Sequence, residues 1–287
     1  MTDPVRPTQW RYLLVDVDGT LLTSRGEITP RSRAALRRAV DRGLTLVLAT
    51  GRTYPSLQRI TGGFDLPFHA ITNGGAVGLA PGMAAVRYVN ALGPSVWPPI
   101  VEAMLAEGLS PVVFGHRHPE PPVLYVASRA GDPHFESYLN RNTLFAQEVS
   151  QLAGADLPDI IEVAALGRGD RFDAASARVM ARFNGQTRHH SMVLFINAAF
   201  GKITEFFDAG TSKWHAFLGL FPEAARHPER VIAIGDEAND VEMIRAAGMG
   251  IAMGNATPEL KSVANRVTAD HDRDGLAEAL EALLPAR

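Results

Sequence analysis

The sequence predicts an α/β protein built on a parallel sheet and interrupted by an inserted segment of mixed α+β character. Short apolar runs alternate with helix-like segments at both ends of the chain, which is typical of parallel strands connected by helices. The middle section lacks this regular alternation. At 287 residues the chain also exceeds one average domain. We therefore expect a discontinuous core domain over residues 1–86 and 205–287, with an inserted α+β domain over residues 87–204.

The N-terminal section begins with the apolar run Tyr12–Val17, which has the composition of a buried parallel strand. Thr29 and Pro30 predict a helix start, because threonine caps helices and proline fits the first helical position. This helix should run to about Arg42, where Gly43 ends it. The next expected elements are a strand at Leu44–Ala49, a helix at Tyr54–Ile60 and a strand at Phe68–Thr72.

The same alternation returns near the C-terminus. The expected strands there are Arg230–Gly235 and Gly250–Met253, and the expected helices are Thr211–Gly219, Ala238–Ala247, Thr257–Ala264 and Gly275–Leu284. Within the insert we expect helices at Pro94–Glu107 and Phe172–Phe183, and strands at Val123–Ala127, Ile160–Ala165 and Met192–Ile196. Two halves of one core around an α+β insert account for this pattern.

Two aspartates follow the first predicted strand, in the segment Asp16-Val17-Asp18-Gly19-Thr20. A carboxylate can attack phosphorus and form an aspartyl-phosphate, which divides hydrolysis into two easier steps. A second carboxyl group two residues further on could protonate the leaving alkoxide and later deprotonate the attacking water. The alternative is an ordinary pair of turn-forming aspartates.

Three further polar segments lie where predicted strands end or a helix begins: Thr50-Gly51-Arg52, Lys213, and Asp236 through Asp240. A hydroxyl, backbone amides and a guanidinium suit phosphoryl oxygens, and a lysine at a helix N-terminus favours an anion. A cluster of acidic side chains suits Mg²⁺. Taken singly, these segments could be a strand-exit turn, a solvated lysine and a helix cap. Because ligands bind beyond the carboxyl ends of parallel strands, we expect the segments to meet at one edge of the sheet.

The composition excludes several classes of protein. The formal net charge is −3 and no Lys/Arg run is present, so we expect no nucleic-acid partner. The absence of cysteine excludes disulfides, thiolate metal sites and a cysteine nucleophile. The first ten residues lack the apolar region of a signal peptide, and no apolar run approaches the ~20 residues that span a bilayer. We therefore expect no membrane association and a cytoplasmic enzyme.

These segments resemble the four motifs of the haloacid dehalogenase (HAD) superfamily, specifically its Cof-type (subfamily IIB) sugar-phosphatase branch. The matching segments are Leu14–Leu22, Ala49–Arg52, Gly210–Lys213 and Gly235–Asp240, and Ile71–Gly75 and Ile251–Ala256 are also Cof-like. Gly75 stands where relatives more usually have alanine, which the sequence suggests is a minor change. The acidic run Asp270–Gly275 departs from the relatives' pattern, and we interpret it as a surface loop near the site rather than a metal loop.

The resemblance implies a Rossmann-like parallel-sheet core with a C2-type cap inserted between the second and third motifs. It implies that Asp16 is the nucleophile and Asp18 the general acid and base. It further implies Mg²⁺ bound by the Asp16 carboxylate, the Asp18 backbone carbonyl and the Asp236 side chain. The implied phosphate-binding residues are Thr50, Gly51, Lys213 and Asn239, and the implied supporting residues are Arg52, Asn73 and Asp240.

The expected function is Mg²⁺-dependent hydrolysis of a small phosphomonoester, such as a sugar phosphate or a related metabolite, through an aspartyl-phosphate. One alternative is a phosphomutase or phosphotransferase that passes the same phosphoryl group to an acceptor other than water. Another is a non-catalytic sensor of phosphorylated ligands. The presence of Asp18 argues against the sensor, because binding alone needs no proton donor. The expected partner is a small phosphorylated metabolite.

Overall fold

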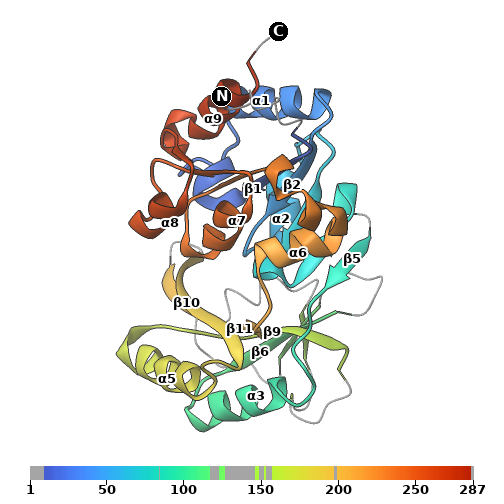
Figure 1. The fold of residues 1–287 in the computed structure, drawn as a ribbon. Helices are drawn as coiled ribbons and strands as arrows, with labels where there is room; N and C mark the ends of the chain where they lie inside the picture. The colour runs from blue at the N-terminus through green and yellow to red at the C-terminus, as the bar shows by residue number, and fades with distance from the viewer. Residues whose placement is uncertain are drawn as a thin grey trace. The chain divides into compact units, whose positions relative to one another are not determined.

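The computed structural model describes residues 10–83, 85–116, 123–126, 146–148, 152, 157–196 and 199–285. These residues form two compact units (Figure 1). The first comprises the chain up to Arg52, Ser56–Tyr88 and the chain from Ser212 onward. The second comprises Thr53–Pro55 and Val89–Thr211. The second unit is therefore inserted within the sequence of the first.

The first unit is organised around an eight-stranded sheet with the order β14-β13-β12-β1-β2-β3-β4-β5. Its strands are β1 (Tyr12–Asp16), β2 (Thr45–Ala49), β3 (His69–Thr72), β4 (Val77–Leu79), β5 (Val86–Val89), β12 (Val231–Gly235), β13 (Met249–Ala252) and β14 (Arg266–Val267). From β14 to β3 all neighbours are parallel. Every residue of β1 and β12 is buried, as expected of central parallel strands covered on both faces.

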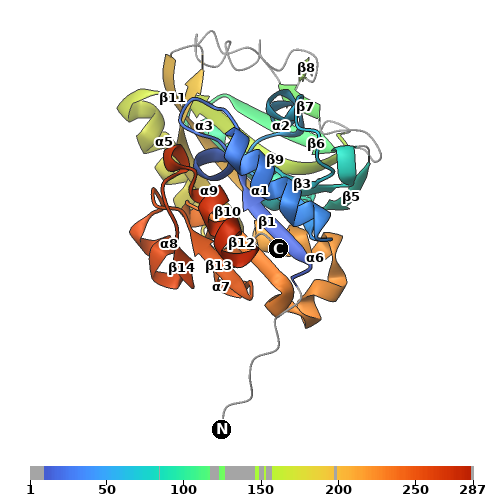
Figure 2. The ribbon, with the colours of Figure 1, turned by 90° about the horizontal axis from the view of Figure 1, so that it is seen from above.

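The helices of this unit are α1 (Pro30–Asp41), α2 (Tyr54–Thr61), α6 (Lys213–Leu220), α7 (Val241–Ala246), α8 (Pro258–Val263) and α9 (Gly275–Leu283). Short helical turns lie at Val17–Leu21, Asn73–Gly75, Pro81–Met83, Pro222–Arg226, Pro228–Arg230, Ala238–Asp240 and His271–Arg273. Helix α1 packs beside α9, as Figure 2 shows, whereas α6 packs against α7 and β4. The Thr29 side chain caps α1, and Pro30 occupies its first position, as predicted.

The second unit has a six-stranded sheet with the order β10-β11-β9-β6-β7-β8. Its strands are β6 (Pro111–His116), β7 (Val123–Val126), β8 (Ala146–Glu148), β9 (Asp159–Gly167), β10 (Thr187–Ile196) and β11 (Ala199–Asp208), and its helices are α3 (Trp97–Ala106) and α5 (Gly169–Arg182). An apolar core joins the helices to the sheet through residues such as Met104, Val113, Val163, Val179 and Phe206.

The predicted α/β class with an α+β insert is confirmed, but the details differ. The core sheet is not wholly parallel, because β4 pairs antiparallel with β3. β4 and β5 are too short to give a clear apolar period, so the sequence did not reveal them. Strand β11 carries the second sheet to Asp208, beyond the expected boundary at residue 204. Within the described ranges, no helix combines the length and apolarity needed to cross a bilayer.

Candidate active site

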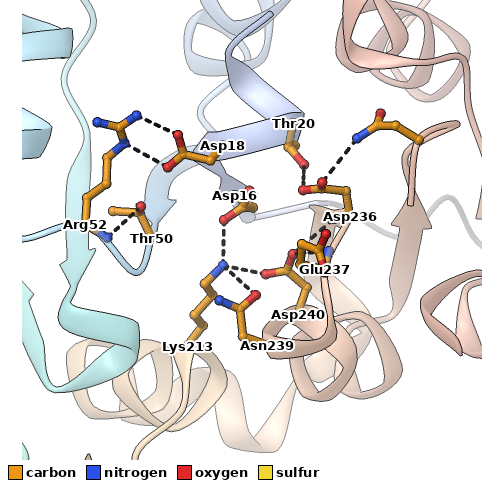
Figure 3. Close-up of polar contacts among 11 residues, drawn as sticks. Asp16, Asp18, Thr20, Thr50, Arg52, Lys213, Asp236, Glu237, Asn239 and Asp240 are labelled. Carbon is orange, nitrogen blue, oxygen red and sulfur yellow. Dashed lines mark hydrogen bonds and ion pairs between the residues drawn. The ribbon is translucent and has the colours of Figure 1, made fainter. Parts of the chain in front are cut away.

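The site lies where the strand order of the first sheet reverses at β1. From β1 the chain builds through β2 and β3 on one side, and later through β12 and β13 on the other. Ligands of open α/β sheets bind at such a switch point. Asp16 is the last residue of β1, Thr50 follows β2, and Asp236 follows β12. Residues far apart in sequence therefore meet at one sheet edge (Figure 3).

A buried ion pair joins Asp16 to Lys213. Lys213 Nζ lies 2.5 Å from Asp16 Oδ1 and 2.6 Å from Asp240 Oδ1. It also donates a longer hydrogen bond of 3.4 Å to Asn239 Oδ1. Lys213 is the first residue of α6, and the preceding Ser212 caps that helix by accepting from a backbone N–H in its first turn. The ammonium group thus contacts oxygen atoms of three side chains, those of Asp16, Asp240 and Asn239.

The turn Asn73–Gly75 supports the beginning of α6. Gly75 has a φ of 114°, and a Cβ atom there would overlap the Ser212 backbone. Glycine at this position is therefore a requirement of the local backbone, and the expectation of a minor change was wrong. Asn73 is fully buried, with its backbone N–H donating to the carbonyl oxygen of Arg52 at 2.9 Å. Asn73 thus fixes the turn that carries Thr50 and Arg52.

Asp240 holds other site residues in place. One of its oxygens accepts from Lys213, and the other accepts from the backbone N–H groups of Asp236 and Glu237 at 3.0 and 3.1 Å. Asp240 is completely buried. Because both of its oxygens are engaged, Asp240 orients the lysine and the Asp236 backbone.

Asp236 faces the same edge from β12. Its Oδ1 accepts from the Thr20 hydroxyl at 3.0 Å, and its Oδ2 accepts from the Asn255 side-chain amide at 3.1 Å. Thr20 and Asn255 lie inside the motif segments, but the family resemblance implies no role for either of them. The sequence signal for Asn255 is its position two residues after the predicted strand Gly250–Met253, at the same sheet edge as the other site residues.

Asp18 and Arg52 form a separate pair at the rim of the site. Arg52 donates from Nε and Nη2 to the two carboxylate oxygens of Asp18 at 2.7 and 2.6 Å, and from Nη1 to Ser56 Oγ at 3.1 Å. The Asp18 side chain is 54% exposed and points toward Arg52 in Figure 3. Thr50 is buried, and its Oγ1 accepts from the Arg52 backbone N–H at 3.0 Å. Gly51 lies exposed between them.

The buried part of the site carries an excess of negative charge. Burial raises the pKa of Asp16 well above its usual value, with Lys213 opposing and Asp240 and Asp236 adding to the rise. Burial, with Asp240 as the next cause, raises the pKa of Asp236 to about 6. Burial alone would lower the pKa of Lys213, but the adjacent Asp16 and Asp240 carboxylates hold that pKa above its usual value. One ammonium group therefore faces three carboxyl groups.

This charge excess fits a divalent cation. Asp16, Asp236 and Asp240 each offer a carboxylate oxygen, and these atoms lie within 4.8 Å of one another. The Asp240 oxygens accept three hydrogen bonds, from the lysine and two backbone amides, whereas the Asp236 oxygens accept two. Asp236 and Asp16 therefore keep more lone pairs for an ion. Carboxylate oxygens are the ligands that hard divalent cations prefer. The Asp236 carboxylate also fills the space that a Cβ atom on residue 19 would need, so Gly19 permits this close approach.

The raised pKa of Asp236 predicts how the metal-free protein responds to pH. Its folded-state pKa of about 6 lies above the ordinary 3.8, so the folded protein binds the proton more tightly than the unfolded chain. Stability in EDTA should therefore rise as the pH falls from 7.5 to 5, by roughly 1–3 kcal/mol, in urea unfolding. Asp236→Asn should remove the share of this dependence that Asp236 contributes, leaving the share due to the raised pKa of Asp16, and should stabilise the metal-free protein at pH 7.5. An unchanged pH profile in the variant would contradict the assignment.

The fold and this site together define a phosphatase-type hydrolase, in which a buried carboxylate and a lysine meet at the switch point of a parallel sheet. The chain belongs to the haloacid dehalogenase-like hydrolase family, whose model matches residues 13–280. It is an enzyme of the HAD phosphatase type, as its curated relatives also indicate.

Two curated relatives match along almost their whole length. The chain is 28% identical over 284 residues to the 5-amino-6-(5-phospho-D-ribitylamino)uracil phosphatase YitU of Bacillus subtilis, covering 94% of this chain and 96% of that protein. It is 26% identical over 277 residues to the pyridoxal phosphate phosphatase YbhA of Escherichia coli, covering 93% and 96%. It also matches 46% of the length of the chloroplastic endoribonuclease YBEY of Arabidopsis thaliana, at 26% identity over 95% of this chain. The chain thus spans about half of that longer relative.

Solved structures agree with the fold. A haloacid dehalogenase-like hydrolase from Bacteroides thetaiotaomicron superposes with a TM-score of 0.73 at 27% identity, covering 96% of this chain and 99% of that one. A sugar phosphatase of HAD subclass IIB superposes with a TM-score of 0.67 at 22% identity, covering 95% and 98%. The match of the family model confirms the predicted HAD family, and these superpositions confirm the fold.

Proposed function

We propose that this HAD phosphatase hydrolyses a small phosphomonoester through transient phosphorylation of Asp16, with Mg²⁺ as its cofactor. The observation that carries the proposal is the buried contact of 2.5 Å between Lys213 Nζ and Asp16 Oδ1, at the carboxyl end of β1. The ammonium group leaves the second oxygen of Asp16 as the attacking atom. It also offers positive charge to the phosphoryl oxygens that arrive beside it.

The proposed reaction has two steps. In the first, Asp16 attacks phosphorus and the bond from phosphorus to the leaving oxygen breaks. Asp18, in its protonated form and turned away from Arg52, gives that oxygen a proton. In the second, Asp18 takes a proton from water, the water oxygen attacks phosphorus, and the bond to Asp16 breaks to release inorganic phosphate. Both aspartates return to their starting state.

Each remaining residue has a proposed part in this reaction. Thr50, Gly51, Lys213 and Asn239 would bind the phosphoryl oxygens through a hydroxyl, backbone amides, an ammonium and an amide. Asp240 would support Lys213 and the Arg52 backbone would support Thr50, whereas the Arg52 guanidinium would hold Asp18. Asn73 would support the Arg52 backbone. A divalent cation held by the Asp16 and Asp236 side chains and the Asp18 backbone carbonyl would offset repulsion between the nucleophile and the phosphate.

The proposed substrate is a small phosphorylated metabolite, such as a sugar phosphate. The names of two curated relatives support this class, since one is a phosphatase of a phosphoribityl-aminouracil and the other of pyridoxal phosphate. We assign the chemistry to the core over residues 1–86 and 205–287. We assign the choice of leaving group to the insert over residues 87–204, because the core motifs account for the phosphoryl group alone.

Asp18→Asn should slow hydrolysis in a manner that depends on the leaving group. An alkyl phosphate needs a proton on its departing oxygen, so its turnover should fall by roughly 10²–10⁴-fold. Release of p-nitrophenol from p-nitrophenyl phosphate, in the first turnover, should fall much less, because nitrophenolate leaves without a proton. Rapid-mixing kinetics on both substrates measure this contrast. Equal losses on both would contradict proton donation by Asp18.

A panel of phosphorylated metabolites tests the proposed function directly. Phosphate release is measured with Mg²⁺, with EDTA, and with added sugars as acceptors. Metal-dependent release of inorganic phosphate from one or more members is the expected result. Transfer of the phosphoryl group to an added sugar in preference to water would show a phosphotransferase instead. No turnover of any member, with intact ligand binding, would show a sensor.

A further inference from the structure

We propose that Asn255 is a positioning residue that aligns the Asp236 carboxylate for the divalent cation. The role rests on the proposed function, since that function supplies the metal. Asn255 lies in the loop that follows β13, and its amide reaches three separate parts of the chain. Its Nδ2 donates to the Gly19 carbonyl oxygen at 2.9 Å and to Asp236 Oδ2 at 3.1 Å. Its Oδ1 accepts from the His271 backbone N–H at 3.1 Å.

The polarity of these partners allows only one orientation of the amide. A backbone carbonyl and an ionised carboxylate can only accept, so the Asn255 NH₂ group must face Gly19 and Asp236. A backbone N–H can only donate, so the Asn255 oxygen must face His271. Rotating the amide by 180° would break all three hydrogen bonds. The His271 N–H therefore fixes the direction in which Asn255 presents its donors to the site.

Asp236 is held on both of its oxygens by this arrangement. Thr20 donates to Oδ1 and Asn255 to Oδ2, which fixes the rotation of the carboxylate about its own axis. The backbone on both sides is held by the same loop: Met253 N–H donates to Gly235 and Thr257 N–H donates to Asp236, each at 3.0 Å. Partners of this kind orient metal ligands, and losing one typically weakens metal affinity by about 10–100-fold.

The acidic run Asp270–Gly275 and the residue before it contact the loop that carries Asn255. Gly254 N–H donates to Ala269 at 3.0 Å, and Asp270 Oδ1 accepts from the Asp272 N–H at 2.8 Å. Asp272 Oδ1 in turn accepts from the Ser24 N–H at 2.8 Å, in the segment just after the nucleophile motif. Carboxylate oxygens of this run are thus engaged with backbone amides. Through Asp272 and His271, the run links Ser24 to Asn255.

Three variants of the full-length protein test this role through Mg²⁺ affinity. Asn255→Asp keeps the acceptor for His271 but replaces both donors with an oxygen that faces two acceptors. Asn255→Ala removes the amide without adding charge. Asn265→Asp is the matched control, because Asn265 is exposed and uses its oxygen to accept from Gly250 N–H at 2.7 Å, which an aspartate also does. Isothermal titration with MgCl₂ alone gives each dissociation constant.

We expect the Mg²⁺ dissociation constant to rise about 10–100-fold in Asn255→Ala and further in Asn255→Asp, with Asn265→Asp within twofold of the wild type. At saturating Mg²⁺, Asn255→Ala should recover most of the wild-type kcat, which a general loss of structure would not allow. Wild-type Mg²⁺ affinity in a folded Asn255→Ala protein would overturn the proposal. A wild type that binds no Mg²⁺ would instead overturn the metal in the proposed function. The two failures are thus distinguishable.

Discussion

Asp16→Asn is expected to reduce phosphatase turnover by about 10⁴-fold or more, which is the scale of losing a covalent nucleophile. Asparagine has nearly the same shape as aspartate, and its side-chain oxygen can still accept from Lys213. It cannot form an acyl phosphate, however, so the first step has no nucleophile. Steady-state phosphate release at saturating Mg²⁺ measures the effect.

The matched control for this variant is Asp41→Asn, which makes the same change at an exposed position on α1. It should retain wild-type turnover. Asp16→Asn should remain folded, because it removes one negative charge from a cluster that has too many. Its urea unfolding in EDTA should show stability equal to or above that of the wild type. Retention of more than a tenth of wild-type turnover by Asp16→Asn would contradict its assignment as nucleophile.

Lys213→Met is expected to destabilise the metal-free protein by about 3–5 kcal/mol, in addition to abolishing turnover. The ammonium group is almost completely buried between Asp16 and Asp240. Removing one partner of a buried ion pair leaves an uncompensated charge, which is much more costly than losing an exposed pair. Methionine keeps a similar length and flexibility, so the charge is the main change. Urea unfolding at pH 7.5 in EDTA measures the loss.

Arg37→Met provides the contrast within the same unit. Arg37 pairs with Asp65 at 2.5 Å, a distance equal to that between Lys213 and Asp16, but the two side chains are 46% and 66% exposed. Water screens such a pair, so its removal should cost about 0–1 kcal/mol. A similar decrease in the free energy of unfolding in the two variants would mean that the buried ion pair of Lys213 stabilises the protein no more than an exposed one.

The sequence predicted the sheet-edge part of the site because the signal is local. Asp16 and Asp236 each follow an apolar run, and parallel strands bring such positions to one edge without further information. Thr50 was predicted by the same rule, and the position of Lys213 came from the predicted helix start. The fold class and the meeting of these polar residues at one sheet edge therefore follow from the pattern of apolar runs alone.

Other features depend on long-range packing and were not predictable in this way. The sequence placed Arg52 at the site but did not reveal that its guanidinium pairs with Asp18. Gly75 looked like a minor change until the Ser212 backbone was found against it. The link from Asn255 to Asp236 joins residues on neighbouring strand ends, and nothing in their spacing reveals which atom meets which.

The central claim is that Asp16 is transiently phosphorylated, and trapping that species tests it most directly. The protein is mixed with a ³²P-labelled phosphomonoester that the substrate panel has identified, quenched in acid within milliseconds and digested. We predict label on the peptide that contains Asp16, sensitive to hydroxylamine as an acyl phosphate should be, and no label in Asp16→Asn. Rapid turnover by the wild type with no labelled protein at any time would contradict the claim. The same holds if Asp18→Asn gains no label from ³²P-labelled p-nitrophenyl phosphate, for which only the second step should be slow.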